Sequence, residues 1–235
     1  MIMHDGDNQF AELKELILSR ASVKQDVYAT TKDVFVEMKD VLGDIAKELS
    51  EYVSEADTRV AVTTTSEGLF ENQMTLGGDT IVLHMHTNVF TFPSSHMIHK
   101  HSYVAKQPEN AYCGIINIYN FLTDSFRFRR MNDSGYLIGR IFLNHERHFF
   151  VEGRGKIGIR FNDFGTAVLN KEAMRDILET ILVYSLNFEL FTPPYHSVDQ
   201  VLLSDMQELS QNLKLQTSKR LGFRFQRDED SGVEF

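Results

Sequence analysis

The feature that most constrains this chain is an apolar stripe that repeats at helical spacing from Lys24 to Val53. Lys, Asp and Glu lie opposite the stripe, as expected for an amphipathic helix. The stripe is formed by Val27, Val34, Met38, Val41, Ile45, Leu49 and Tyr52. About thirty residues at 1.5 Å per residue predict a rod of roughly 45 Å. A helix of that length packs along a whole sheet or along a second subunit.

Two other segments show the same period. Residues 8–20 carry apolar residues at helical spacing, so the helical N-terminal segment is predicted to span 8–53. Residues 171–190 follow Asn170, which suits an N-cap, and stop before Pro193. We expect this helix, a shorter one starting at Ser204 and a last strand at 221–226 to form a C-terminal region over 170–226. Residues 227–235 read as a polar tail.

Between the helical segments the apolar period changes to two, which indicates strands. The short Gly- and Asn-rich connections predict antiparallel hairpins over 58–165, because parallel neighbours need long crossovers. The candidate strands are 59–66, 68–76, 79–92, 112–121, 124–130, 135–143, 147–153 and 156–162. The sequence therefore predicts an α+β fold: a mostly antiparallel sheet of seven to nine strands, with the long helix and the C-terminal helix on one face.

Composition sets the broad class of protein. With 42% hydrophobic and 24% charged residues over 235 positions, the chain is typical of a globular protein, and no composition shift divides it, so 1–235 is expected to be one domain. The single Cys113 excludes an internal disulfide. There is no signal-peptide pattern at the start and no apolar run of about 18 residues, so we expect a cytoplasmic protein without a membrane span.

Five of the nine histidines fall between positions 84 and 101. His84 and His86 would share one face of a strand, and His96, His99 and His101 follow in a loop that could fold back. Gly78, five residues and His84-x-His86 resemble the opening of the cupin metal motif, although the Glu that follows there is absent from 87–91. A divalent metal site is one interpretation; a polar strand face with a solvated loop is the other.

The centre of the chain is basic although the formal net charge is −9. Arg127 and Arg129 would share a strand face, Arg130 and Asn132 would follow in a turn, and Arg140 would return on the next strand. Arginine forks suit phosphate, carboxylate or single-stranded nucleic acid. The alternative is a solvated sheet face whose arginines pair with acids of the N-terminal helix.

The remaining motifs point to turns. Gly153-x-Gly155-x-x-Gly158 and His145-Glu146-Arg147-His148 both lie where turns between strands are expected, which is the wrong context for a dinucleotide or zinc motif. No catalytic constellation stands out. We therefore expect a cytosolic binding or interaction module that is not an enzyme, needs no cofactor and self-associates through the 24–53 helix. The alternatives are a metal-dependent enzyme or metal-binding protein that uses the histidines, and a nucleotide- or RNA-binding protein that uses the arginines.

Overall fold

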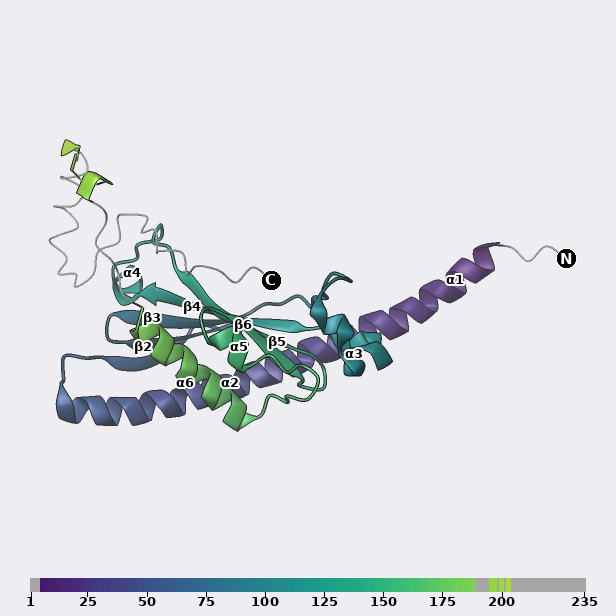
Figure 1. Ribbon diagram of the computed structural model, residues 1–235, viewed down its shortest axis with the longest axis horizontal. Coiled ribbons are helices and arrows are strands. Elements are labelled where there is room, and N and C mark those ends of the chain that lie inside the picture. The colour runs from purple at the N-terminus through teal and green to yellow at the C-terminus, as the bar shows by residue number, and fades with distance from the viewer. Residues whose placement is uncertain (1–4, 189–194, 198, 201, 204–235) are drawn as a thin grey trace.

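The structure is a computed structural model that describes residues 5–188, 195–197, 199–200 and 202–203. Its longest element is a continuous helix that extends well beyond the rest of the molecule (Figure 1). It consists of α1 (Asp5–Leu16), a π-helical turn η1 (Ile17–Ala21) and α2 (Ser22–Ala56). Leu16 and Ala21 keep helical backbone angles, so the two predicted patterns of 8–20 and 24–53 form one helix without a break.

The sheet is a simple antiparallel meander in which each strand pairs with the next in sequence. Its strands are β1 (Val62–Ser66), β2 (Glu71–Leu76), β3 (Asp79–Met85), β4 (Gly114–Leu122), β5 (Tyr136–Leu143) and β6 (Phe149–Gly153). The predicted antiparallel sheet is confirmed, but the expected count of seven to nine strands is wrong, because the described chain forms six.

Two predicted strands are helical turns. The first part of the predicted strand 124–130 belongs to α4 (Thr123–Arg127), and the left-handed Arg129 (φ 50°) follows this helix. The alternation of Phe and Arg over 126–129 is only four residues long, which also fits one helical turn. A hydrogen bond of 2.7 Å from the Ser125 hydroxyl to the Asp133 carboxylate closes this loop.

The predicted strand 156–162 instead contains α5 (Ile157–Arg160). A strand would turn Ile157 and Ile159 to the same face, but Ile157 is buried while Ile159 is exposed. Ile157 packs so closely on Gly153 that a Cβ at Gly153 would lie 2.5 Å from its Cγ2. The Gly-rich segment is therefore a turn that leads into a short helix, not a hairpin between two strands.

One large hydrophobic cluster joins α2, one face of the sheet and α6 (Lys171–Leu186). The long helix contributes most of its predicted stripe, including Val34, Met38 and Ile45, and α6 contributes residues such as Ile177 and Ile181. Asn170 caps α6 as predicted, since its side chain accepts a hydrogen bond from the Ala173 amide. The stripe from Val34 to Ile45 is thus covered by the chain's own sheet and α6, whereas Tyr52 is 72% exposed.

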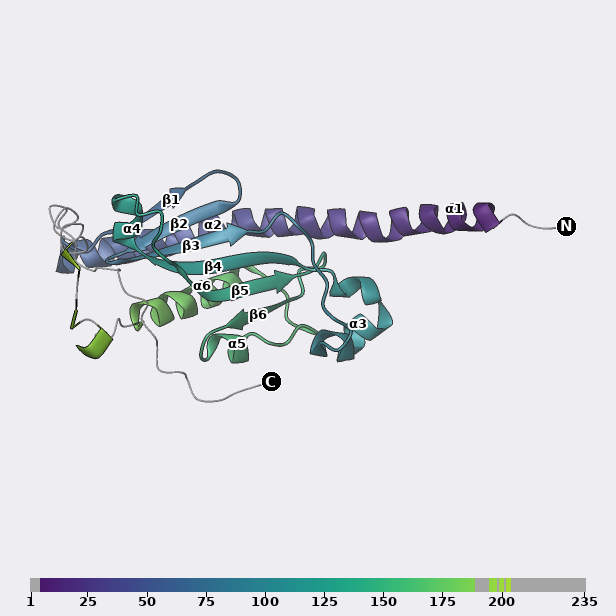
Figure 2. The same cartoon turned by 90° about the horizontal axis from the view of Figure 1, so that it is seen from above.

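The opposite face of the sheet is covered only near its ends (Figure 2). The connection from β3 to β4 holds η2 (Met97–Lys100), α3 (Ser102–Lys106) and η3 (Pro108–Ala111), and it builds a second cluster with Phe142 and Phe150 at one end of this face. At the other end lies α4. We call the side of the sheet that faces away from α2 and α6 the open face.

The last described element is η4 (Tyr195–Ser197). The predicted helix from Ser204, the strand at 221–226 and the polar tail 227–235 lie outside the described residues. No helix in the described part of the chain is both long enough and apolar enough to cross a membrane.

Candidate functional site

The first two predicted histidines do not share a strand face. β3 ends at Met85, so only His84 lies in the strand, on the open face. His86 belongs to the turn that follows: its Nδ1 accepts a hydrogen bond of 3.0 Å from the Asn88 amide, and its ring meets Phe90 edge-on at 4.8 Å.

The other three histidines help to fold the β3–β4 connection. His96 stacks on Phe92 with ring centres 4.5 Å apart, and the His99 Nε2 lies 3.1 Å from the Phe92 carbonyl oxygen. The His101 carbonyl accepts the first amide hydrogen bonds of α3. Within the described residues, no three His, Cys, Asp or Glu side chains form a group that could hold a metal ion. The structure therefore does not unite the five histidines.

The predicted arginines are divided between two places. Arg127 ends α4, and Arg127 and Arg130 both lie near the Phe128 ring, at 5.3 and 5.5 Å from its centre. Arg129 is exposed in the left-handed region, so it does not share a strand face with Arg127, and Asn132 is exposed in the next turn.

Arg140 lies apart from this group in β5 and pairs with Glu152 of β6 at 2.6 Å. The interpretation that these arginines pair with acids of the N-terminal helix is wrong for Arg140. A different arginine of the basic region does make such a pair: Arg147 binds Glu37 of α2 through two hydrogen bonds of 2.6 and 3.0 Å.

One histidine and one arginine from the two predicted sets do meet on the open face. The strand register aligns five polar residues across β2 to β6 in a single row: Glu71, His84, Asn117, Arg140 and Glu152. We call this line the polar row. His84 and Arg140 lie two strands apart, which corresponds to roughly 10 Å.

The residues of the polar row differ in how they are paired. Its ends are internally paired, because Gln73 donates to Glu71 at 2.7 Å and Arg140 donates to Glu152. In the described chain, His84 and Asn117 make no side-chain hydrogen bond and remain half-buried at the centre. The centre of the row therefore presents one imidazole and one amide, both of which can form hydrogen bonds to a polar ligand.

The segment His145-Glu146-Arg147-His148 lies in the turn between β5 and β6, as predicted. The buried Asn144 side chain accepts hydrogen bonds from the backbone amides of Glu146 and His148, and it donates one of 2.8 Å to the Tyr103 hydroxyl. Tyr103 in turn donates to Glu146. Burial and then the bond to Glu146 raise the pKa of Tyr103 far above its usual range. This group anchors α3 to the turn.

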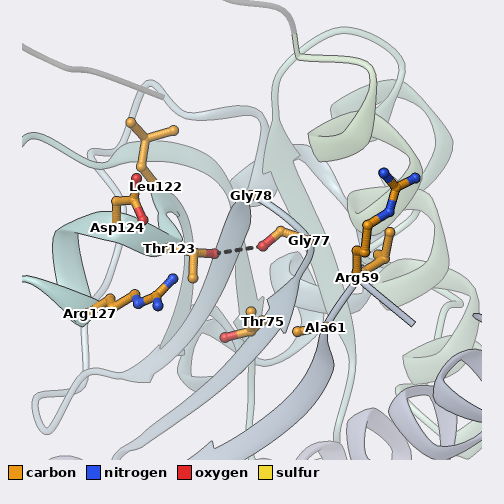
Figure 3. Close-up of a pocket in the computed structure, with 10 residues that line it drawn as sticks. Arg59, Ala61, Thr75, Gly77, Gly78, Leu122, Thr123, Asp124 and Arg127 are labelled. Carbon is orange, nitrogen blue, oxygen red and sulfur yellow. Dashed lines mark hydrogen bonds between the residues drawn. The ribbon is translucent and has the colours of Figure 1, made fainter. Parts of the chain in front are cut away.

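A pocket of about 390 Å³ opens beside α4, where the β2–β3 turn meets the end of β4 (Figure 3). The Thr123 hydroxyl closes its floor with a hydrogen bond of 3.3 Å to the Gly77 carbonyl. Gly77 has φ +61°, a left-handed conformation that favours glycine and lets this turn form. The remaining lining comes from Arg59, Val60, Ala61, Thr75, Gly78, Leu122, Asp124 and Arg127.

The charged groups of this pocket differ in how they are paired. Arg59 binds Asp57 at 2.6 Å, and its guanidinium turns away from Arg127 (Figure 3). Arg127 extends towards Thr123 and forms no ion pair within the described residues. Asp124 is 8% exposed, and its buried Oδ2 has no hydrogen-bond partner in the described chain. The pocket thus places an unpaired cation and an unpaired anion side by side.

The sequence identified Arg127 as a site residue but did not single out Asp124 or the Gly77–Gly78 turn. Comparison with known proteins adds no further guide, because no protein-family model, curated protein or solved structure matches this chain.

Proposed function

We propose that this protein is a non-enzymatic interaction module that self-associates through the exposed part of its N-terminal helix. We call residues 9–21 the N-terminal arm. Every residue of the arm is exposed, including apolar ones at helical spacing: Phe10 is 57% exposed, Leu13 48% and Ile17 55%. This unpartnered apolar stripe is the observation that supports the proposal.

The position of the arm explains why it would need a partner. Helices in water gain most of their stability from packing of an apolar face, and short isolated ones are marginal. The α2 part of the helix has that packing in its own sheet, but the arm projects past the sheet as Figures 1 and 2 both show. The self-association expected at 24–53 is therefore assigned to the arm instead.

The charges of the arm favour an antiparallel pair of two copies. Glu12 lies in the outer half of the arm, at the edge of the apolar stripe. Arg20 lies in the inner half, within the stripe. In an antiparallel pair centred near Leu16, Glu12 of each copy approaches Arg20 of the other. A parallel pair would bring like charges together, which is unfavourable. A two-fold symmetric contact of this kind closes on itself as a dimer.

Sedimentation over a range of protein concentrations tests the proposal. Wild type should dimerise, and Ile17→Glu should raise the dissociation constant at least a hundredfold, because each dimer loses two apolar side chains worth about 1.5–3 kcal/mol each. Leu18→Glu is the matched control: Leu18 is 70% exposed but lies on the far side of the arm from the stripe. A wild type that remains monomeric at high concentration would refute self-association.

The orientation has its own test by charge exchange. Glu12→Arg and Arg20→Glu should each weaken the dimer, and the double variant should restore it, since the exchanged charges again face each other. If the losses of dimer affinity in the two single variants simply add in the double variant, the antiparallel arrangement is wrong.

The two alternatives from the sequence remain predictions without this support. The described histidines offer no metal-binding group, and the arginines predicted to bind nucleotide or RNA are split between α4 and the polar row.

A further inference from the structure

The pocket beside α4 is independent of the N-terminal arm, and its two unpaired charges call for an explanation of their own. Asp124 is more than nine-tenths buried, and its Oδ2 meets no donor in the described chain. A buried carboxylate without a partner is unfavourable, and a bound ligand is one way to compensate it. The protein covers Oδ2 almost completely, so a ligand cannot reach that atom, but a cation beside the other carboxylate oxygen would compensate the charge.

Arg127 does not supply the missing donor. It is three residues after Asp124 on the same helical turn, a spacing at which ion pairs form readily. Nevertheless, no ion pair joins the two side chains, and Arg127 lines the pocket with its guanidinium towards Thr123 (Figure 3). The guanidinium fork is thereby available for an oxyanion.

The pair of charges restricts the chemistry of a ligand. A simple anion would be attracted by Arg127 but repelled by Asp124. A simple cation would be attracted by Asp124 but repelled by Arg127. A small molecule with both charges satisfies both residues. The volume of about 390 Å³ lies within the range of small-molecule sites, which span roughly 300–1,000 Å³.

We propose that this pocket binds a free amino acid, with its carboxylate on Arg127 and its ammonium group on Asp124. Thr75 and Thr123 then lie beside the bound molecule, and Val60, Ala61 and Leu122 provide apolar walls. The site uses no residue of the arm, so it does not depend on self-association.

Thermal unfolding of the full chain with each of the common L-amino acids at millimolar concentration tests the site. At least one should raise the melting temperature, because a ligand that binds only the folded state stabilises it. The matched deaminated acid and the matched decarboxylated amine of that amino acid should bind at least tenfold more weakly. If no amino acid raises the melting temperature, or if the deaminated acid binds equally well, the proposal is wrong.

Variants then assign the two charges. Asp124→Asn and Arg127→Gln should each weaken binding of the best amino acid at least tenfold, while the neighbouring Arg129→Gln, outside the pocket lining, should leave it unchanged. Without ligand, Asp124→Asn should melt at the same temperature as wild type or higher, since it removes an unpaired buried charge. A lower melting temperature for unliganded Asp124→Asn would show that Asp124 is paired within the chain, which would overturn the proposal.

Discussion

Replacing Gly114 by Ala tests how the long helix is seated on the sheet. Gly114 begins β4 directly beneath Thr31 of α2, and a Cβ at this position would lie 2.0 Å from the Thr31 Oγ1 and 2.8 Å from its Cβ and Cγ2. Ordinary contacts between such atoms lie near 3.5–4 Å, so the overlap exceeds about 1 Å. Thr31 is fully buried and donates to the Val27 carbonyl at 2.6 Å, so it has little room to rotate.

Overpacking of this kind costs about 1–3 kcal/mol, and the fixed Thr31 places Gly114→Ala at the upper end. Thr31→Gly removes all three clashing atoms but costs roughly 0.3 kcal/mol in helix propensity, because Thr is itself a weak helix former, besides the lost contacts. The double variant should therefore lose about 1–2 kcal/mol less free energy of unfolding than the two single variants lose together.

Urea unfolding followed by circular dichroism, at one fixed protein concentration, measures each free energy of unfolding. The reasoning fails if Gly114→Ala loses less than about 0.5 kcal/mol, or if the effects in the double variant simply add. Thr31→Ala provides an intermediate check, because it retains the Cβ at 2.8 Å and should relieve the clash only in part.

Two other predictions concern the ion pair and the single thiol. Glu37→Gln should lower the free energy of unfolding by about 0.5–1 kcal/mol near neutral pH, since the half-exposed Arg147 pair is partly screened by solvent. The hydrogen bond from Arg147 lowers the pKa of Glu37 in the folded protein. The ion pair therefore stabilises the fold above the unfolded pKa of about 4.3, and this contribution disappears as the pH falls through the lower folded pKa. Urea titrations at several pH values should show the stabilities of wild type and Glu37→Gln converging at that low pH. Cys113 is fully buried, and burial strongly raises the pKa of its thiol, so a thiol reagent should label it in urea but not in buffer, and rapid labelling in buffer would contradict the packing.

The elements that the sequence predicted well are those whose signal is long. The stripe over 24–53 corresponds to α2 at Ser22–Ala56. About eight helical turns of apolar spacing fit a helix and do not fit a strand. The stripe did not reveal whether a sheet or a second subunit covers it, since both present the same apolar surface to a helix. Burial of Val34 and Met38 in the chain's own core resolves that choice.

The site was harder to predict because it depends on contacts between distant residues. Arg127 and Asp124 meet the Gly77–Gly78 turn only after β3 and β4 have paired, and no local pattern encodes that meeting. The polar row has the same origin: His84 and Arg140 are more than fifty positions apart, and only the register through Asn117 aligns them. The Phe–Arg alternation over 126–129 led to the wrong prediction of a strand because it is short, and four residues cannot distinguish a strand from one helical turn.

The long helix physically connects the two proposed sites. Its first residues form the arm, and Arg59 to Ala61, just after its end at Ala56, line the pocket (Figure 1). Coupling between two such sites requires an element with two alternative arrangements that both ligands bias. The α2 stripe is buried against the sheet, and Thr31 lies in contact with β4 at Gly114, so a shift of α2 along its axis would drive side chains into the strands. We therefore expect no change to pass from one end of this helix to the other. Self-association and amino-acid binding should therefore be energetically independent, and each proposal can fail without the other.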